Sequence, residues 1–204
     1  MAKVLINSIV NELEEFIEHY GSMPIVIGID PGKHGAFAII DAYSNKCYAT
    51  LKMPCYKNEI DWNVVLHILS NLKAQTLALG VEDIHPRPSR NRGAASQGKF
   101  LKQAGMLEGI IFAIGFTTYK YNPLSWKKKY GLSISKAEKA ALGIKTDAQK
   151  TKELKRRAIE KAENVLSKWE WPEYKITDGQ AEAFLVATMA RTDLMTAQEG
   201  DTLD

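Results

Sequence analysis

Cysteine is scarce in this chain of 204 residues, and its two cysteines, Cys47 and Cys55, lack the partner spacing of a zinc site. Each lies in or beside an apolar segment, so we expect two reduced thiols rather than a disulfide framework. Long hydrophobic runs are also missing: none approaches the roughly 20 residues that span a bilayer, and no signal-peptide pattern opens the chain. We therefore expect a soluble cytoplasmic protein with no membrane partner.

A large net charge is absent too, because the formal charge is only +3. With 45% hydrophobic residues the chain can bury one sizeable core. Its basic residues nevertheless gather in two stretches, residues 84–107 with no acid and residues 119–157 with twelve Lys or Arg against three acids. Such stretches in a nearly neutral chain indicate an anionic partner, with nucleic acid the first choice. The alternative is that these lysines are simply solvated on surface helices.

The pattern that organises the chain is the apolar run at residues 25–29, which ends in Asp30 and is followed by Pro31 and Gly32. It predicts a buried strand, and a second apolar run at 36–40 predicts a hairpin partner. A carboxylate at the end of such a strand is costly unless a cation or a hydrogen-bond donor meets it. Asp30 is therefore either a site residue or an aspartate that caps the turn.

A further apolar run, residues 77–81, ends in a carboxylate, Glu82. It follows a predicted helix, so it is a natural parallel neighbour of the first strand, and Asp30 and Glu82 would then share one edge of the sheet. Asp83 competes with Glu82 for this place, but side-chain alternation puts only one of the two on the active face.

The remaining pattern predicts an α/β protein with a mixed sheet. The predicted elements are helices at 2–20, 61–72, 94–115, 146–169 and 178–191, antiparallel strands at 25–30, 35–41 and 46–53, strands at 77–82 and 116–121, and a loop at 122–126. The expected inner stripes include Leu66 in the second helix and Leu101 in the third. We expect an N-terminal helical extension at 1–22, one domain at 23–194 and a flexible tail at 195–204.

The third helix contains Gly98, Gly105 and Gly109, each of which costs about 1 kcal/mol relative to alanine. They need a packing reason, which is either a second copy of the chain or the chain's own sheet.

Asp178 and Glu182 lie four residues apart at the start of the last helix, so both project from one face. Together with Asp30 and Glu82 they would place four carboxylates in one pocket, which only protons or hard cations make tolerable. Oxygen ligands without His or Cys select Mg²⁺ or Mn²⁺, and a pair of such ions is a common device for phosphodiester hydrolysis. The alternatives are a helix N-terminal acid for Asp178 and a solvated surface residue for Glu182.

Four motifs occur in a fixed order over roughly residues 24–190. They are Gly-Ile-Asp-Pro-Gly at 28–32, Val81-Glu82 with Ser-Gln-Gly-Lys-Phe at 96–100, Pro-Leu-Ser-Trp-Lys at 123–127, and Asp-Gly-Gln-Ala-Glu-Ala at 178–183. In this order they resemble the RuvC-type Holliday-junction resolvases, and in particular the branch found in bacteriophages.

The resemblance implies an RNase H-like fold with a mixed five-stranded sheet flanked by helices and an extra N-terminal helix. It further implies a homodimer through the helix near residues 95–114. The activity implied is Mg²⁺-dependent nicking of two strands at a four-way DNA junction, with two ions per site and Mn²⁺ as a substitute. The metal ligands would be Asp30, Glu82, Asp178 and Glu182. In the better-known bacterial members the last two acids are usually three apart and the second is aspartate, so the glutamate here has a longer arm.

The resemblance also places a lysine at the scissile phosphate, either Lys127 or Lys128. The expected DNA-binding residues are Arg87, Arg90, Arg92, Lys99, Lys102, Lys127, Lys128 and Lys129. Phe100 or Trp126 could stack on an unpaired base, although a core role is favoured for each.

Other functions remain open at this stage. A nuclease of the same fold could act broadly on flaps, three-way junctions and replication intermediates, and a non-catalytic protein could bind junctions without cutting them. Gly-Ile-Asp-Pro-Gly also resembles the first phosphate loop of sugar kinases and actin-like ATPases, but those proteins pair two such lobes and the sequence contains no second motif of this kind.

Overall fold

A computed structural model describes residues 11, 13–83, 94–172 and 175–201. Its main sheet has five strands in the order β3-β2-β1-β6-β7. The strands are β1 (Ile25–Asp30), β2 (Ala36–Asp41), β3 (Cys47–Lys52), β6 (Thr76–Glu82) and β7 (Thr118–Tyr121). The first three form an antiparallel meander, while β6 runs parallel to β1 and β7 parallel to β6. This confirms the mixed five-stranded sheet predicted from the sequence.

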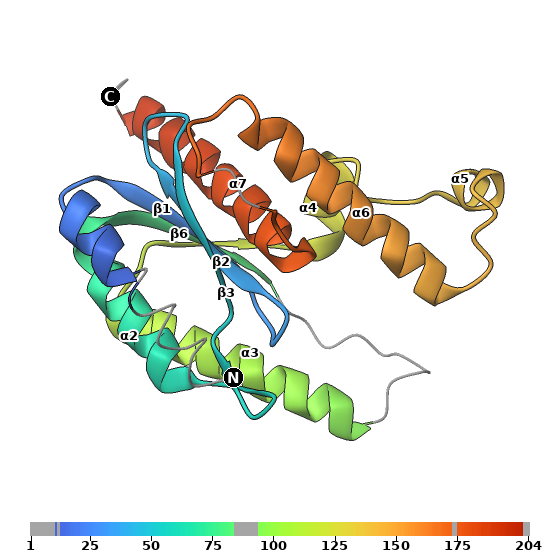
Figure 1. The fold of residues 1–204 in the computed structure, drawn as a ribbon, viewed down its shortest axis with the longest axis horizontal. Coiled ribbons are helices and arrows are strands. Elements are labelled where there is room, and N and C mark those ends of the chain that lie inside the picture. Colours follow the sequence, from blue (N-terminus) through green and yellow to red (C-terminus); the bar gives the residue numbers. More distant parts are fainter. Residues whose placement is uncertain (1–10, 12, 84–93, 173–174, 202–204) are drawn as a thin grey trace.

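Helices cover both faces of the sheet (Figure 1). They are α2 (Trp62–Leu72), α3 (Ala94–Ile114), α4 (Pro123–Lys129), α5 (Lys136–Ala141), α6 (Asp147–Leu166) and α7 (Asp178–Asp201). A short hairpin, β4 (Cys55–Tyr56) with β5 (Glu59–Ile60), precedes α2. The helix at 13–20, α2 and α3 pack on one face, and α4, α6 and α7 on the other. No helix in the described ranges is long and apolar enough to cross a membrane.

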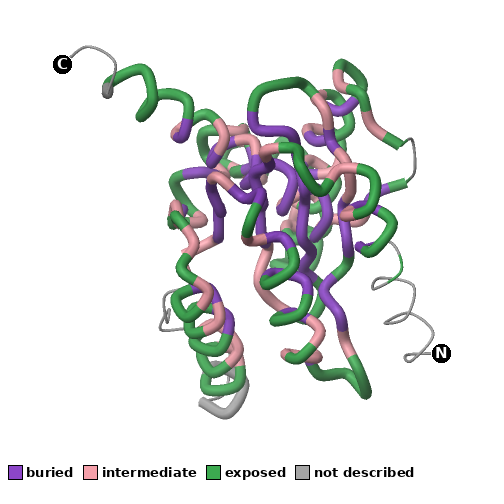
Figure 2. The backbone as a smooth tube through the Cα atoms, turned by 90° about the vertical axis from the view of Figure 1, so that its left-hand side faces the viewer, coloured by how far each residue is buried: buried purple, intermediate pink, exposed green. Residues whose placement is uncertain are grey.

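The core consists of two apolar layers, one on each side of the sheet, because successive strand residues point to opposite faces. In β1, Ile25, Ile27 and Ile29 join the α2–α3 side, whereas Val26 joins the α6–α7 side. Figure 2 shows this buried centre within an exposed periphery. Leu13 and Phe16 are also buried here, so the described part of the N-terminal helix packs on the same core as the sheet.

The structure corrects several local predictions. The predicted loop at 122–126 is mostly helix, since α4 spans 123–129; the Asn122 side chain accepts a hydrogen bond from the N–H of Leu124 and proline suits the first turn of a helix. Leu66 and Leu101 are 43% and 37% exposed instead of lying on inner stripes, and Ile68 takes the buried place in α2. The last helix continues to Asp201, ten residues beyond the predicted end, so most of the expected tail is helical.

Candidate active site

Asp30 and Glu82 end two adjacent parallel strands. The register pairs Ile29 with Val81, so the next residue of each strand lies at the same edge of the sheet. Because parallel neighbours place their carboxyl ends together, the two acids approach each other although they are far apart in the sequence.

The α7 helix reaches the same edge because glycines let it lie directly on the strands. A Cβ at Gly28 would stand 2.1 Å from the carbonyl oxygen of Ala183, and one at Gly179 would stand 2.2 Å from that of His34. Neither position has room for a side chain. This close approach puts the first turn of α7, with Asp178 and Glu182, beside the end of β1.

A lysine side chain from α4 lies among these acids. The Lys127 Nζ atom lies 3.1 Å from Glu82 Oε1 and 2.7 Å from Glu182 Oε2. Lys127 therefore joins the acid of β6 to the acid of α7. The preceding residue, Trp126, is 2% exposed and donates a hydrogen bond of 3.1 Å from its indole Nε1 to the same Glu82 Oε1.

The acids perturb one another strongly. Burial raises the pKa of Asp30 well above its ordinary value, and the nearby carboxylates of Glu182, Glu82 and Asp178 raise it further. Burial also raises the pKa of Glu182, and Lys127 only partly offsets this. Burial by itself would lower the pKa of Lys127, but attraction to Glu182 and Glu82 outweighs it and raises that pKa. The group thus holds excess negative charge around one ammonium.

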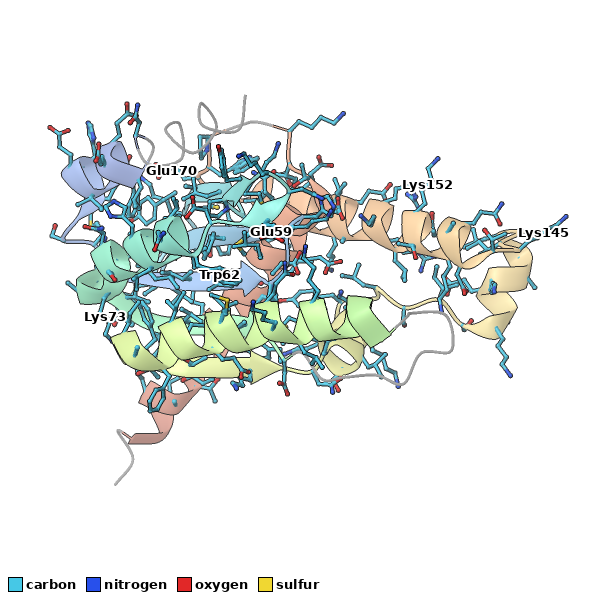
Figure 3. The ribbon with its side chains drawn as sticks, turned by 90° about the horizontal axis from the view of Figure 1, so that it is seen from below. Glu59, Trp62, Lys73, Lys145, Lys152 and Glu170 are labelled. Carbon is cyan, nitrogen blue, oxygen red and sulfur yellow. The ribbon has the colours of Figure 1, made fainter. Side chains whose placement is uncertain are left out.

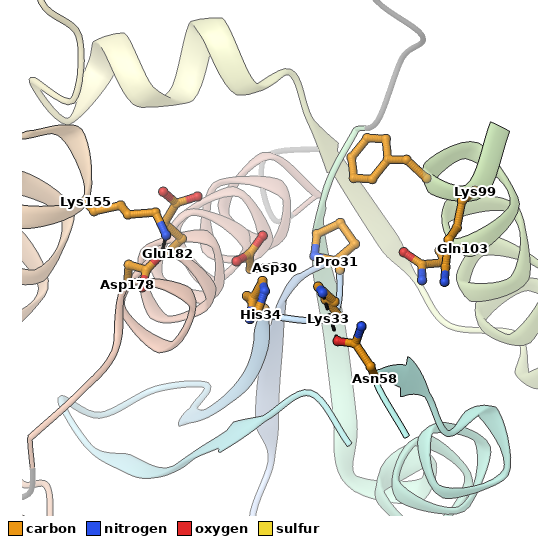
Figure 4. Close-up of a pocket in the computed structure, with 13 residues that line it drawn as sticks. Asp30, Pro31, Lys33, His34, Asn58, Lys99, Gln103, Lys155, Asp178 and Glu182 are labelled. Atoms are coloured by element: carbon orange, nitrogen blue, oxygen red, sulfur yellow. Dashed lines mark hydrogen bonds and ion pairs between the residues drawn. The ribbon is translucent and has the colours of Figure 1, made fainter. Parts of the chain in front are cut away.

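Figure 4 shows the open side of this group, a cavity of about 460 Å³. Asp30, Asp178 and Glu182 line it, whereas Glu82 contacts Trp126 and Lys127 and is not part of the lining. Positive charge surrounds the mouth: Lys155 of α6 pairs with Asp178 at 2.6 Å, and Lys33 and Lys99 also line the wall. The cavity therefore combines a carboxylate floor with a basic rim.

The donor set fits a hard divalent cation, since the cavity offers carboxylate oxygens and no cysteine is among its lining residues; His34 lines it as well. In the described part of the chain no group of three His, Cys, Asp or Glu is already arranged as a metal site. The physical reason is visible in the geometry: the Lys127 ammonium lies between Glu82 and Glu182, where it supplies the positive charge that the acids require.

The predicted DNA-binding residues have different surroundings. Lys127 points to the acids, whereas Lys128 and Lys129 are exposed. Lys99 pairs with Glu59 at 3.0 Å, and with Lys102 it lines a neighbouring cavity of about 450 Å³. Arg87, Arg90 and Arg92 lie outside the described residues.

Trp126 has the core role that the sequence favoured over base stacking, because its ring is buried between α4 and the sheet side of the core. Phe100 is half-buried and lines the carboxylate cavity, so base stacking by this residue stays open.

Two residues at this site were not found by sequence reasoning, namely Lys155 and Trp126 as the partner of Glu82. The basic stretch at residues 119–157 was recognised, but nothing local distinguishes Lys155 from the other lysines in it. The Trp126–Glu82 contact joins residues 44 positions apart and depends on where α4 lies.

Comparison with known proteins gives matches only at the level of structure. No protein-family model and no curated protein matches the sequence. Among solved structures, T. thermophilus RuvC in complex with a Holliday junction substrate superimposes with a TM-score of 0.54 at 15% identity, covering 86% of this chain and 96% of that one. The chain has the RuvC fold.

A second structure, of Thermus thermophilus RuvC, has a TM-score of 0.50 at 16% identity over the same shares of the two chains. The yeast mitochondrial Holliday junction resolvase Ydc2 matches more distantly, at a TM-score of 0.42 and 15% identity, over 96% of this chain and 95% of that one. At these identities the likeness concerns the fold, and the chemistry depends on the residues described above.

Proposed function

We propose that this protein is a divalent-metal-dependent endonuclease that resolves four-way DNA junctions. The observation that carries the proposal is the convergence of acids from β1, β6 and α7 at one edge of a RuvC-like sheet, beneath a basic rim. Asp30, Glu82, Asp178 and Glu182 would hold two Mg²⁺ ions, with Mn²⁺ as a substitute. Such ions lower the pKa of a bound water and stabilise charge on the leaving oxygen of a phosphodiester.

The chain's own part is to position the DNA. Lys127 is the family lysine that points at the acids, so it is the better candidate for the scissile phosphate than the exposed Lys128. With cations held by the acids, the Lys127 ammonium would no longer be needed between Glu82 and Glu182, and its flexible stem would let it turn towards a phosphate. Lys33, Lys99 and Lys155 on the rim favour approach of a polyanion to an otherwise acidic cavity.

A basic arm, defined as residues 131–157, extends this interface. Figures 1 and 3 show α5 and the first half of α6 projecting beyond the sheet. The fully buried residues of α6 are Ala158, Ala162 and Leu166, all in its second half. The arm is nonetheless braced, because Arg157 bonds Glu138 of α5 at 2.7 Å and Glu153 of its own helix at 2.9 Å. We infer that it holds a DNA arm through phosphates.

The arm is tested by salt dependence. Lys152 is exposed on the arm, and Lys168 is equally exposed beyond the other end of α6. We expect Lys152→Ala to reduce the slope of log affinity against log salt by about 0.9 and Lys168→Ala to leave it unchanged. Equal slopes for both variants would argue against the arm as a DNA surface.

The open face of α3 supports the expected homodimer. Gly98, Gly105 and Gly109 each have empty space where a Cβ would stand, so packing on the chain's own sheet does not explain them. Phe112 lies on the same face at helical spacing and is 86% exposed. Small residues around an exposed aromatic ring permit close approach of a second helix, and a twofold partner would cover them.

The dimer is tested by one substitution and a matched control. We expect Phe112→Asp to yield monomers in sedimentation experiments, whereas Leu66→Asp, the same kind of change at an exposed position of α2, leaves the mass unchanged. A monomeric wild type at micromolar concentration would contradict the dimer.

The order of the motifs also supports a place in the bacteriophage branch, and a phage-encoded enzyme would act in the host cytoplasm.

The activity itself is tested on four-way, three-way, flap and linear duplex substrates with Mg²⁺ and with EDTA. We expect paired nicks in the four-way junction with Mg²⁺ alone. Equal cutting of all branched substrates would favour the broader nuclease, and binding without cutting would favour a non-catalytic junction-binding protein. ATP hydrolysis without DNA would favour the ATPase hypothesis.

A further inference from the structure

The α4 helix places two consecutive side chains on one carboxylate oxygen. Trp126 Nε1 and Lys127 Nζ each lie 3.1 Å from Glu82 Oε1. The Lys127 ammonium also lies 5.0 Å from the centroid of the Trp126 ring. Of the three groups, the indole is the one enclosed by protein, because Trp126 is 2% exposed and packs within the core layer beneath α4.

These two donors differ in how they respond to an incoming cation. An ammonium and a metal ion repel each other and compete for the same carboxylates, so Lys127 must move when a metal binds. A neutral indole N–H does not compete for the site, and a ring fixed by core packing cannot leave it. With a cation bound by the acids, Trp126 would therefore keep its hydrogen bond to Glu82 Oε1 and leave the second carboxylate oxygen available.

The position of α4 is itself fixed from both ends. β7 pairs with β6 so that Tyr121 lies opposite Glu82, and Asn122 caps the helix that starts immediately afterwards. Further along, Tyr130 contacts the Trp126 ring edge-on with centroids 6.3 Å apart, and its hydroxyl lies 2.9 Å from the Thr188 hydroxyl of α7. The indole is thus tied to the strand that carries Glu82 and to the helix that carries Glu182.

We propose that Trp126 is a positioning residue that orients the Glu82 carboxylate as a metal ligand. The inference rests on the proposed function, since it concerns the same metal site. Outer hydrogen bonds to ligating carboxylates commonly change metal affinity by about 10- to 100-fold when removed. The role assigned to Trp126 is that of such an outer partner, and it requires no contact with DNA.

The direct test is Mn²⁺ binding to the full chain without DNA. Binding is measured by calorimetry or from the electron-spin-resonance signal of free Mn²⁺. Trp126→Phe removes the N–H and keeps an aromatic ring, and we expect it to weaken Mn²⁺ binding about tenfold. The matched control is Trp169→Phe, because Trp169 packs edge-on against Phe184 at 5.3 Å on the same side of the sheet. We expect the control to bind Mn²⁺ as the wild type does.

A second measurement needs no variant to fold well. In ¹⁵N-labelled wild-type protein, titration with Mg²⁺ should shift the indole N–H resonance of Trp126 more than those of Trp62 and Trp169.

A third measurement uses the variant: cleavage by Trp126→Phe should recover at high Mn²⁺ concentration, with affinity for junctions in EDTA unchanged. A role confined to core packing would lower the melting temperature without moving the Mn²⁺ midpoint.

The outcomes separate the two proposals. Wild-type protein that binds no Mn²⁺ would overturn the metal site itself, and this inference with it. Wild-type protein that binds Mn²⁺ while Trp126→Phe binds it equally well, or while the Trp126 resonance does not respond, would overturn the role of Trp126 and leave the nuclease proposal standing.

Discussion

Asp30 is the last residue of β1 and Asp41 the last residue of β2. Because these neighbouring strands are antiparallel, the two aspartates lie at opposite ends of the strands of one sheet. Asp41 has neutral donors around it: its Oδ1 accepts from the N–H groups of Tyr43 and Ser44 at 2.9 and 2.6 Å, and its Oδ2 accepts from the Tyr48 hydroxyl at 2.7 Å. Asp30 instead faces the carboxylates of Glu182, Glu82 and Asp178.

The pKa of each aspartate reflects these surroundings. Burial would raise the pKa of Asp41, but the hydrogen bonds from Tyr48, Tyr43 and Ser44 outweigh it and lower that pKa. At Asp30 burial and neighbouring acids act in the same direction and raise it. A strand-end aspartate with local donors serves the fold, whereas one crowded by acids is destabilising unless a cation joins it.

The largest expected effect is a loss of cleavage activity when the aspartate of the carboxylate group, Asp30, is replaced. We expect Asp30→Asn to reduce junction cleavage by about three orders of magnitude, since a lost metal ligand removes several kcal/mol of transition-state stabilisation. Binding of junctions in EDTA should persist. The measurement is single-turnover cleavage with Mg²⁺, and full cleavage by this variant would remove Asp30 from the site.

The next effect concerns the cation that holds the acids together. Lys127→Met should lower the free energy of unfolding without metal by about 2 kcal/mol, less than for fully buried pairs because the ammonium side chain is 28% exposed. Added Mg²⁺ should then raise the melting temperature of this variant more than that of the wild type. Equal responses to Mg²⁺ would show that Lys127 and the metal do not share one place.

The opposite edge should show the reverse pattern. Asp41→Asn keeps the shape of the side chain but loses a charged acceptor, so we expect the free energy of unfolding to fall by about 1.5 kcal/mol with cleavage unchanged. Urea denaturation and the cleavage assay measure the two quantities. A loss of cleavage larger than the loss of folded protein would contradict a purely structural role.

The smallest effect is the pH dependence of stability at Asp41. Its pKa is lower in the folded protein than the value of about 3.9 in an unfolded chain, so its contribution is fully present above that value. It is lost as the pH falls through the folded pKa. The acid limb of the stability curve should therefore be shallower in Asp41→Asn, and identical limbs below pH 4 would show that Asp41 is not the group responsible.

Much of the fold follows from local patterns. Runs of strand length predicted β1, β2, β3 and β6, and the pattern at 146–169 predicted the helix α6, which Thr146 caps. The α4 helix was missed because Asn122 and Pro123 suit both a turn and a helix start, and only the contacts of Trp126 decide between them. Leu66 and Leu101 were misplaced since a hydrophobic residue near the edge of a stripe can face either way.

By itself the sequence determined that Asp30 and Glu82 stand at strand ends and that Asp178 and Glu182 share a helical face, because the periods of strands and helices are fixed by backbone geometry. Only the tertiary structure decided that Lys127 lies between Glu82 and Glu182, that Lys155 meets Asp178, and that Trp126 holds Glu82. Those contacts join residues 23 to 55 positions apart, and they exist because α4, α6 and α7 pack against one side of the same sheet.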